Sequence, residues 1–349
     1  MKKKKIAVAL FNLGGPGSLA EVKGFLFNLF FDKRIITLPT PFRWLLAKLI
    51  STLRNSKAQV IYKKLGGKSP IVFNTKKQSE KLQKFLGKSS HDYKVFYAMR
   101  HSEPSTEKLI SDLRKLSPDE IILLPLYPQF SSTTTLSSFE EFERLQKEDK
   151  KLSEVKTRKI CCYYDNKDFV KSQVKIIKDV FAKDKLDKKK VRILFSAHSL
   201  PCSIIESGDP YQWQIEKNTE LIMKDKFFSG VDHVICYQSK VGLKKWLSPT
   251  TESEIKRAAD DGLGVVIVPI AFVSEHSETL VELDMDYKEL AKECSIKSYS
   301  RVKTQGNEDI FIESLGSMCL NLLNSKSKNI KTIRKCPKKF CFCIKGNNG

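Results

Sequence analysis

An acidic row follows a histidine in the stretch SEHSETLVELDMDY at residues 274–287. Its carboxylates Glu278, Glu282 and Asp286 are spaced i, i+4 and i+8, which places them near one face of a helix. In a regular α-helix such a row drifts around the axis, and a π-type widening would align it better. Like charges on one face repel, so the row favours a metal path over a structural helix. The alternative is a solvated acidic face.

A second candidate is His198, which stands in FSAHSLP (195–201) at the end of an apolar run. A lone histidine at a strand end is more often a structural residue than a ligand. A loop on the same sheet edge could nevertheless bring it near Glu278, 80 positions away. An imidazole that faces a carboxylate suits divalent iron, cobalt or zinc, and either group could accept a proton near neutral pH. Which group binds metal and which accepts protons stays open.

Apolar runs with the length and branching of buried strands must position these residues. They lie at 6–13, 94–99, 120–126, 191–197, 233–238 and 265–272. Segments with helical periodicity separate most of them, for example 75–86 and 105–116. This alternation predicts βαβ units with parallel sheets. We expect the α/β class: two Rossmann-like domains, each a parallel β-sheet flanked by helices, with a cleft between them.

The strands fall into two groups, which sets the expected domains. We expect an N-terminal domain at 1–165, a C-terminal domain with the metal-site residues at 166–325, and a basic, cysteine-containing tail at 326–349. An internal similarity supports two halves. The stretches 120–138 and 264–282 each run from a buried strand through a proline and an aromatic residue to a Ser/Thr-bearing loop and a helix. Ligands of open α/β sheets bind beyond the carboxyl ends of the strands, where both loops and His198 are expected.

The segment 24–50 is rich in Phe, Leu and Ile but interrupted by charges and prolines. It predicts two amphipathic helical pieces around a proline elbow. They could be core-facing helices, or an exposed apolar lip suited to a flat apolar ligand or a membrane surface.

Composition narrows the function classes. The net charge of +22 comes almost wholly from lysine spread along the chain, and no segment shows a nucleic-acid motif with interleaved aromatics, so we expect no nucleic-acid partner. The N-terminal apolar run, eight residues long and ended by Gly14, favours a buried strand over a signal peptide. The sequence has no run of 18 apolar residues, so we expect no membrane-spanning helix. The odd count of nine cysteines argues against a secreted disulfide scaffold.

Seven stretches in order resemble the ferrochelatase family over roughly residues 5–323. They are NLGGP (12–16), GGKSPI (66–71), YPQFSSTTTLSS (127–138), FSAHSLP (195–201), GDPY (208–211), YQSKVGLKKWLSP (237–249) and EHSETLVELD (275–284). The resemblance implies a chelatase-like fold and an enzyme of the lyase class that inserts Fe²⁺ into protoporphyrin IX, gives protohaem and releases two protons. Fe²⁺ is then a substrate.

The resemblance also implies roles for individual residues. His198 falls on an iron ligand or pyrrole-proton acceptor, Glu278 on the metal-site glutamate, and Glu282 on a second acid that carries protons or metal. His276 matches a histidine of the same loop. The implied substrate-binding residues are Leu13, Tyr127, Arg34, Arg100 and Trp246.

Further expectations concern the location, the assembly and the cofactor of the protein. The enzyme would be cytoplasmic, as a monomer or homodimer, with peripheral contact at the inner face of the membrane. Some ferrochelatases carry a [2Fe–2S] cluster on C-terminal cysteines, and the tail resembles that arrangement through Cys336, Cys341 and Cys343, with Cys161 or Cys162 as a fourth ligand. The alternative for the tail is a lysine-rich segment without a cluster. The alternatives for the whole protein are a chelatase for cobalt or coproporphyrin, or a non-catalytic tetrapyrrole-binding module.

Overall fold

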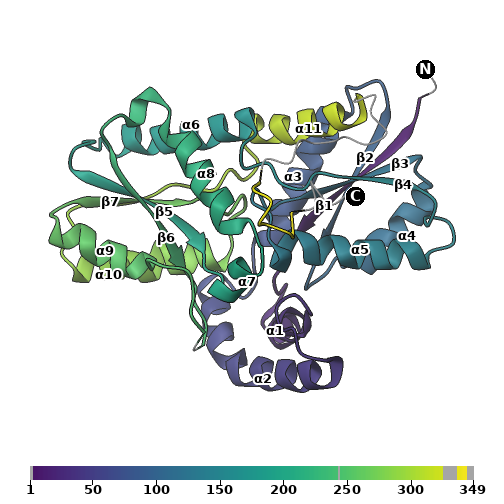
Figure 1. Ribbon diagram of the computed structural model, residues 1–349, viewed down its shortest axis with the longest axis horizontal. Coiled ribbons are helices and arrows are strands. Elements are labelled where there is room, and N and C mark those ends of the chain that lie inside the picture. The colour runs from purple at the N-terminus through teal and green to yellow at the C-terminus, as the bar shows by residue number, and fades with distance from the viewer. Residues whose placement is uncertain (1–2, 243, 325–335, 344–349) are drawn as a thin grey trace. The chain divides into compact units, whose positions relative to one another are not determined.

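Strands and helices alternate along the chain in the computed structural model, which describes residues 3–242, 244–324 and 336–343 (Figure 1). The chain folds into two compact units, each with most of its residue contacts inside itself. Unit 1 is Met1–Cys162 with Ile312–Lys331, and unit 2 is Tyr163–Phe311 with Thr332–Gly349. Each unit contains a four-stranded parallel sheet flanked by helices, which confirms the predicted fold class.

The sheet of unit 1 has the strand order β2-β1-β3-β4. Its strands are β1 (Lys5–Asn12), β2 (Asp92–Met99), β3 (Glu120–Pro125) and β4 (Lys156–Lys159). The helices that alternate with them are α3 (Ile71–Leu86), α4 (Thr106–Leu116) and α5 (Ser137–Glu148), and α11 (Asp309–Asn324) comes late in the chain. Phe11 of β1 packs edge-on against Phe139 and Phe142 of α5, with ring centroids 6.1 and 5.9 Å away. This aromatic contact fixes α5 on the sheet.

The sheet of unit 2 repeats this plan in the order β6-β5-β7-β8. Its strands are β5 (Val191–His198), β6 (Asp232–Gln238), β7 (Gly264–Pro269) and β8 (Tyr299–Arg301). Its helices are α6 (Lys167–Lys183), α7 (Cys202–Glu206), α8 (Tyr211–Met223), α9 (Thr251–Asp260) and α10 (Tyr287–Glu293). Side chains alternate along β5: Phe195 packs with the α6 and α8 residues, and Leu194 with those of α9 and α10. Because both faces are covered, the central strands are continuously apolar.

A π-helix follows the third strand of each sheet in chain order. Ser132–Leu136 comes after β3, and Glu278–Asp286 after β7. The internal similarity between 120–138 and 264–282 is therefore confirmed as a shared strand, loop and π-helix. The π-type widening expected from the spacing of Glu278, Glu282 and Asp286 is also confirmed.

The strand predictions were incomplete at the sheet edges. The strands β4 and β8 were missed because their sequences, KTRK and YSR, carry no apolar run. The prediction that the last strand extends over the whole apolar run to residue 272 was wrong. Strand β7 ends at Pro269, where the chain turns and the Phe272 N–H donates to the Pro269 carbonyl.

The segment 24–50 forms parts of two helices, as predicted: α1 (Val22–Phe31) and α2 (Thr40–Lys64), with Pro39 at the N-cap of α2. The two helices share a small core made by Val22, Phe25, Leu26 and Tyr62. The opposite side of α2 exposes Phe42, Leu45, Leu49 and Leu53, each more than half exposed. This exposure favours the apolar lip over core-facing helices. In the parts of the chain that the structure describes, no helix is long and apolar enough to cross a membrane.

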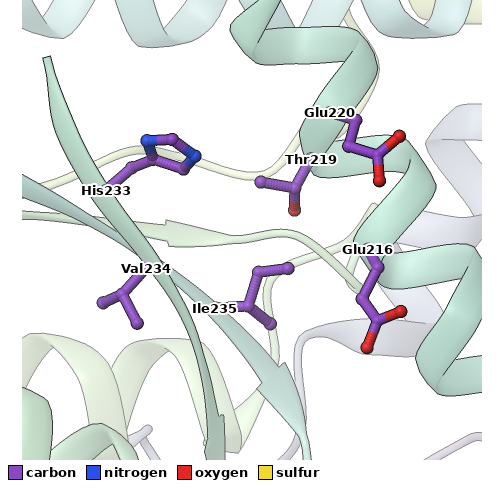
Figure 2. A pocket seen from close by; sticks show the side chains of 6 residues that line it. All are labelled: Glu216, Thr219, Glu220, His233, Val234 and Ile235. Carbon is purple, nitrogen blue, oxygen red and sulfur yellow. The ribbon is translucent and has the colours of Figure 1, made fainter. Parts of the chain in front are cut away.

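A hollow of about 310 Å³ on unit 2 lies between α8 and the edge strand β6 (Figure 2). Its polar side chains come from Glu216, Thr219, Glu220 and His233. His233 pairs in register with Ile193, five residues before the end of β5. At about 3.3 Å per residue, His233 lies roughly 16 Å along the sheet from the edge where ligands of such folds bind, and Ile235, the lining residue of β6 nearest to that edge, lies roughly 10 Å from it.

Candidate active site

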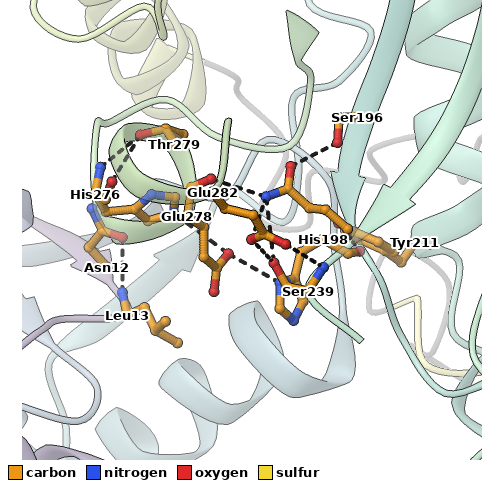
Figure 3. Close-up of polar contacts among 11 residues, drawn as sticks. Asn12, Leu13, Ser196, His198, Tyr211, Ser239, His276, Glu278, Thr279 and Glu282 are labelled. Carbon is orange, nitrogen blue, oxygen red and sulfur yellow. Dashed lines mark hydrogen bonds and ion pairs between the residues drawn. The ribbon is translucent and has the colours of Figure 1, made fainter. Parts of the chain in front are cut away.

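His198 and Glu278 meet at the carboxyl edge of the unit 2 sheet. His198 ends β5, and Glu278 begins the π-helix that follows β7. The His198 Nδ1 lies 3.1 Å from the Glu278 Oε2 (Figure 3). Strands β5 and β7 are neighbours whose connections leave in opposite directions, which is the switch point where open α/β sheets bind ligands. The two side chains are 35% and 30% exposed, so a substrate can reach both.

Two neighbouring segments fix the backbone of His198. The Tyr211 hydroxyl donates to the His198 carbonyl at 3.0 Å, from the first turn of α8. The Ser199 N–H donates to the Gln238 carbonyl at 2.8 Å and continues the pairing of β5 with β6. The imidazole therefore projects from a rigid strand end, which is the support that a catalytic group needs.

The charges of the pair shift both pKa values. Burial alone would lower the pKa of His198, but the charge and hydrogen bond of Glu278, with a smaller effect of Glu282, raise it above 6.5. Burial would raise the pKa of Glu278, yet His198 and then His276 bring it down to about 2. The carboxylate is thus ionised across the physiological range, while the imidazole holds a proton to a higher pH than a free histidine.

His276 lies on the other side of the same carboxylate. Its Nε2 is 3.9 Å from the Glu278 Oε2, and its ring packs edge-on against Phe272 with centroids 4.5 Å apart. Burial lowers the pKa of His276 below its ordinary value, although Glu278 and Glu275 oppose the shift. Glu278 is therefore flanked by two different imidazoles. The ring of His198 favours its own protonated form, and the ring of His276 favours its own neutral form.

Glu282 lies one π-turn beyond Glu278 and is held by donors from three residues. The Ser239 N–H donates at 3.0 Å, the Gln238 Nε2 at 3.0 Å, and the Tyr287 hydroxyl at 2.9 Å, while the Ser239 hydroxyl makes a further short contact. Burial and the charge of Glu278 nevertheless raise the pKa of Glu282 above its ordinary value. Asp286, the last member of the row, is exposed at the end of the π-helix.

Gln238 and Ser239 are site residues that sequence reasoning did not single out. Gln238 ends β6 and bridges the row, because its Nε2 also donates to the Glu278 carbonyl at 3.1 Å and its Oε1 accepts from the Ser196 hydroxyl. Ser239 has φ 63°, a left-handed conformation that is costly for a residue other than glycine. The available signal was their position, since the YQSK stretch stands at the end of the second apolar run of the second half.

Arg301 anchors both ends of the stretch that carries the acidic residues. Its Nη1 donates to the Glu275 Oε1 at 2.7 Å, and its Nε and Nη2 donate to the two Asp284 oxygens at 2.7 Å. The Thr304 N–H also donates to the Glu275 Oε1 at 2.9 Å. A guanidinium that binds two carboxylates holds the loop and the π-helix in one arrangement. This residue, at the end of the short strand β8, was also missed.

The implied substrate-binding residues outside this cluster belong to both units. In unit 1, Leu13 and Arg100 directly follow β1 and β2, and Tyr127 lies two residues after the end of β3. Arg34 pairs with Glu140, and Arg100 bonds Ser137 at 2.8 Å and pairs with Asp32 at 3.2 Å. In unit 2, Trp246 forms an antiparallel bridge with Pro201, the last residue of FSAHSLP. That these five residues line one crevice with His198 stays a prediction.

The cysteine segment of the tail packs within unit 2. Cys336, Phe340 and Cys343 are buried and contact Trp213 of α8. The Gln214 Nε2 donates to the Cys336 Sγ at 3.2 Å, and the Cys341 thiol donates to the Ser207 carbonyl at 3.3 Å. The structure brings no three His, Cys, Asp or Glu side chains into a metal-binding group within residues 3–242, 244–324 and 336–343.

A first prediction concerns the protonation of His198. Glu278→Gln removes the charge that raises the pKa of His198, so burial should dominate and the pKa should fall below 6.5. Glu282→Gln should lower it less, because Glu282 contributes the smaller effect. Titration of the metal-free protein, followed by NMR of the imidazole, measures both.

The stability of the metal-free protein should follow the same pair. The raised pKa of His198 adds stability that is complete below pH 6.5 and lost as the pH rises through the folded value. The lowered pKa of Glu278 adds stability that is complete above pH 4.5 and lost as the pH falls toward 2. Glu278→Gln should therefore destabilise most between pH 4.5 and 6.5, and a pH-independent loss would contradict the ion pair.

Comparisons with known proteins indicate the family to which the chain belongs. A sequence profile described as Ferrochelatase matches residues 5–322. A protein named Ferrochelatase from Wolbachia sp. subsp. Drosophila simulans is 51% identical over 91% of this chain and 99% of the relative. One from Rickettsia felis is 47% identical over 98% of each. SirB from Bacillus subtilis with Fe3+ shares the fold, with a TM-score of 0.52 and 12% identity over 91% of this chain and 95% of that one. The chain belongs to the ferrochelatase family.

Proposed function

We propose that this metal chelatase, an enzyme of the lyase class, inserts Fe²⁺ into protoporphyrin IX at the His198–Glu278 pair, giving protohaem and two protons. The observation that carries the proposal is the 3.1 Å contact between an imidazole and a carboxylate at the sheet switch point of a ferrochelatase-family chain. Both groups are partly exposed, as an incoming substrate requires.

We assign the iron to Glu278 and the pyrrole protons to His198. A carboxylate with a pKa of about 2 is a weak base but stays ionised to attract a divalent cation. A histidine with a pKa above 6.5 accepts protons near the working pH. The arrival of Fe²⁺ on Glu278 would cancel the charge that raises the pKa of His198, so the imidazole loses its proton when it must act as a base.

Porphyrin geometry gives the remaining residues their tasks. A free-base porphyrin is planar, so metal entry requires bending of the ring and removal of two N–H protons. Apolar contacts from residues such as Leu13 and Trp246 would supply strain energy of about 1–5 kcal/mol. Glu282, whose pKa is raised, takes protons from the site, and neutral His276 holds the far side of Glu278.

The proposed reaction is tested by metal and tetrapyrrole competition. The purified protein should convert Fe²⁺ and protoporphyrin IX to protohaem without oxygen, faster than Co²⁺ or coproporphyrin at equal concentrations. Preference for coproporphyrin or cobalt would replace the substrate assignment. Porphyrin binding without turnover would instead identify a non-catalytic tetrapyrrole-binding module.

We propose that the lip, meaning the exposed face of α2, docks on an anionic membrane surface, at the inner face for a cytoplasmic enzyme. Phe42, Leu45, Leu49 and Leu53 form an apolar stripe along α2. The helix contains no acidic residue, and its cations are Arg43, Lys48, Arg54, Lys57, Lys63 and Lys64. The Lys48 Nζ lies 4.7 Å from the Trp44 ring centre. An apolar stripe bordered by cations is typical of helices that lie in the membrane interface.

Membrane docking predicts a lipid-dependent affinity. The protein should sediment with vesicles that contain phosphatidylglycerol, and binding should weaken with pure phosphatidylcholine or high salt. Leu49→Glu should reduce binding by about tenfold or more, because it removes one apolar side chain from the stripe and adds a negative charge. Phe73→Glu, at an exposed aromatic residue on α3, is the matched control. Equal effects of the two substitutions would exclude the α2 stripe as the docking face.

The [2Fe–2S] cluster and the oligomeric state stay proposals. Three cysteines within eight positions support a cluster, and cluster irons are held by thiolates. The thiols do not converge as arranged, so binding would have to release the Cys341 contact with Ser207. Cys161 and Cys162, the candidate fourth ligands, are buried. Visible absorption and iron content of anaerobically purified protein would decide the cluster, and light scattering would distinguish monomer from homodimer.

A further inference from the structure

A hydrogen-bonded chain leads from Glu282 toward the protein surface. The Tyr287 hydroxyl lies 2.9 Å from the Glu282 Oε1 and 3.2 Å from the Glu252 Oε1. Tyr287 is buried, whereas Glu252, in the first turn of α9, is partly exposed. We propose that Tyr287 and Glu252 form a proton exit that passes protons from Glu282 to solvent, an inference that rests on the proposed chelatase function.

The π-helix is what places Tyr287 beside Glu282. The Tyr287 N–H donates to the Glu282 carbonyl, five residues earlier, so the main chain and the side chains of the two residues are both hydrogen-bonded. In a regular α-helix, a residue five positions along lies about 140° around the axis. The hydroxyl could not reach Glu282 from there. The widened helix therefore aligns the acidic row and also gives its second carboxylate an outward partner.

Hydrogen counting shows that the three groups can hold one extra proton. A phenol has one O–H, so it can donate to only one of two carboxylates. The second contact is a hydrogen bond only when that carboxyl is itself protonated. Burial and the charge of Glu278 raise the pKa of Glu282, and burial with two carboxylates raises the pKa of Tyr287. The phenol thus stays protonated, and Glu282 is the carboxyl that favours the proton.

The transfer balances without another reactant. Protonated Glu282 gives its proton to the Tyr287 oxygen while the Tyr287 O–H proton moves to the Glu252 carboxylate. Glu282 is left ionised, the phenol is unchanged, and Glu252 releases the proton to water. A neutral phenol is a poor ligand for Fe²⁺, so this route fits protons rather than metal. Each porphyrin that receives a metal releases two protons, so the proton exit is used on every turnover.

The test compares two tyrosines of the same hydrophobic core. Tyr287→Phe removes the bridging hydroxyl, and Tyr299→Phe removes a hydroxyl that donates to the Leu283 carbonyl at 2.5 Å. We expect Tyr287→Phe to lower kcat about tenfold with unchanged KM for Fe²⁺ and porphyrin, and to raise the solvent isotope effect on kcat. Imidazole buffer at high concentration should restore much of the rate. Glu252→Gln should behave likewise, and Glu289→Gln, an exposed glutamate on α10, should not.

The outcomes separate this inference from the proposed function. If the wild-type protein inserts no metal, the proposed function fails. If the wild type is active and Tyr287→Phe matches Tyr299→Phe in kcat, isotope effect and buffer response, the proton exit is wrong. A loss of kcat that buffer does not restore, accompanied by a lower melting temperature, would assign Tyr287 a structural role and would equally overturn the exit.

Discussion

His198→Ala and Glu278→Gln should each reduce iron insertion by roughly 10²- to 10⁴-fold, the range of a positioned acid–base or ligand group. The losses should differ in kind. His198→Ala should lower kcat, because the pyrrole protons lose their acceptor, whereas Glu278→Gln should also raise the KM for Fe²⁺, because the cation loses its charged ligand. An anaerobic assay with Fe²⁺ and protoporphyrin IX measures both constants.

Control variants test whether the loss of iron insertion is specific to His198 and Glu278. His233→Ala removes an exposed histidine of unit 2 that lies on β6 by the separate hollow, and its activity should stay within about twofold of wild type. Circular dichroism should show both site variants folded. The double variant should be little worse than the more impaired single variant, because the two residues act as one unit. Wild-type turnover in either single variant would remove that residue from the mechanism.

Arg301→Met should have the largest effect on stability. The substitution leaves Glu275 and Asp284 without the guanidinium that both accept from, and Arg301 itself is largely buried. Removing one partner of a buried ion pair costs about 3–5 kcal/mol, and partial exposure of the carboxylates reduces this to about 2–4 kcal/mol. In a unit of this size, the loss corresponds to a melting temperature lower by roughly 5–15 °C. Thermal unfolding followed by circular dichroism measures it.

Arg301→Met should also impair turnover, although Arg301 touches none of the proposed reacting groups. It bonds residues on both sides of His276, Glu278 and Glu282, so its loss frees the whole stretch to move. We expect kcat about tenfold lower at a temperature where the variant stays folded. Arg257→Met is the matched control, because Arg257 also binds a carboxylate, Glu254, but is half exposed and should cost less than about 1 kcal/mol. Similar costs for both variants would show that Arg301 is not the anchor.

Local patterns in the sequence determined most of the fold. Central strands such as β3 and β7 are buried on both faces, so they stand out as continuous apolar runs, and the helices between them predict parallel sheets. The edge strand β8 gave no such pattern because only three residues form it. The acidic row predicted even the π-helix, since spacing along a helix is a local property.

The contact between His198 and Glu278 could be predicted from the sequence only by way of the expected sheet topology. Parallel strands share a carboxyl edge, so His198 after one strand and Glu278 after another could be expected to meet, and their 3.1 Å contact now gives that expectation atomic detail. Their opposite pKa shifts could not be predicted, because those shifts depend on burial and on the distances between the charges.

What the sequence by itself determined is the class of fold, the motifs and the acidic row. Only the tertiary structure revealed the partners of that row: Gln238 and Ser239 around Glu282, Arg301 across Glu275 and Asp284, and the contact from Tyr287 to Glu252. The physical reason is that these are single polar contacts between segments up to 44 residues apart. A hydrophobic period marks which face of an element is buried, but a hydrogen bond depends on where two side chains end in space, which the packed fold alone decides.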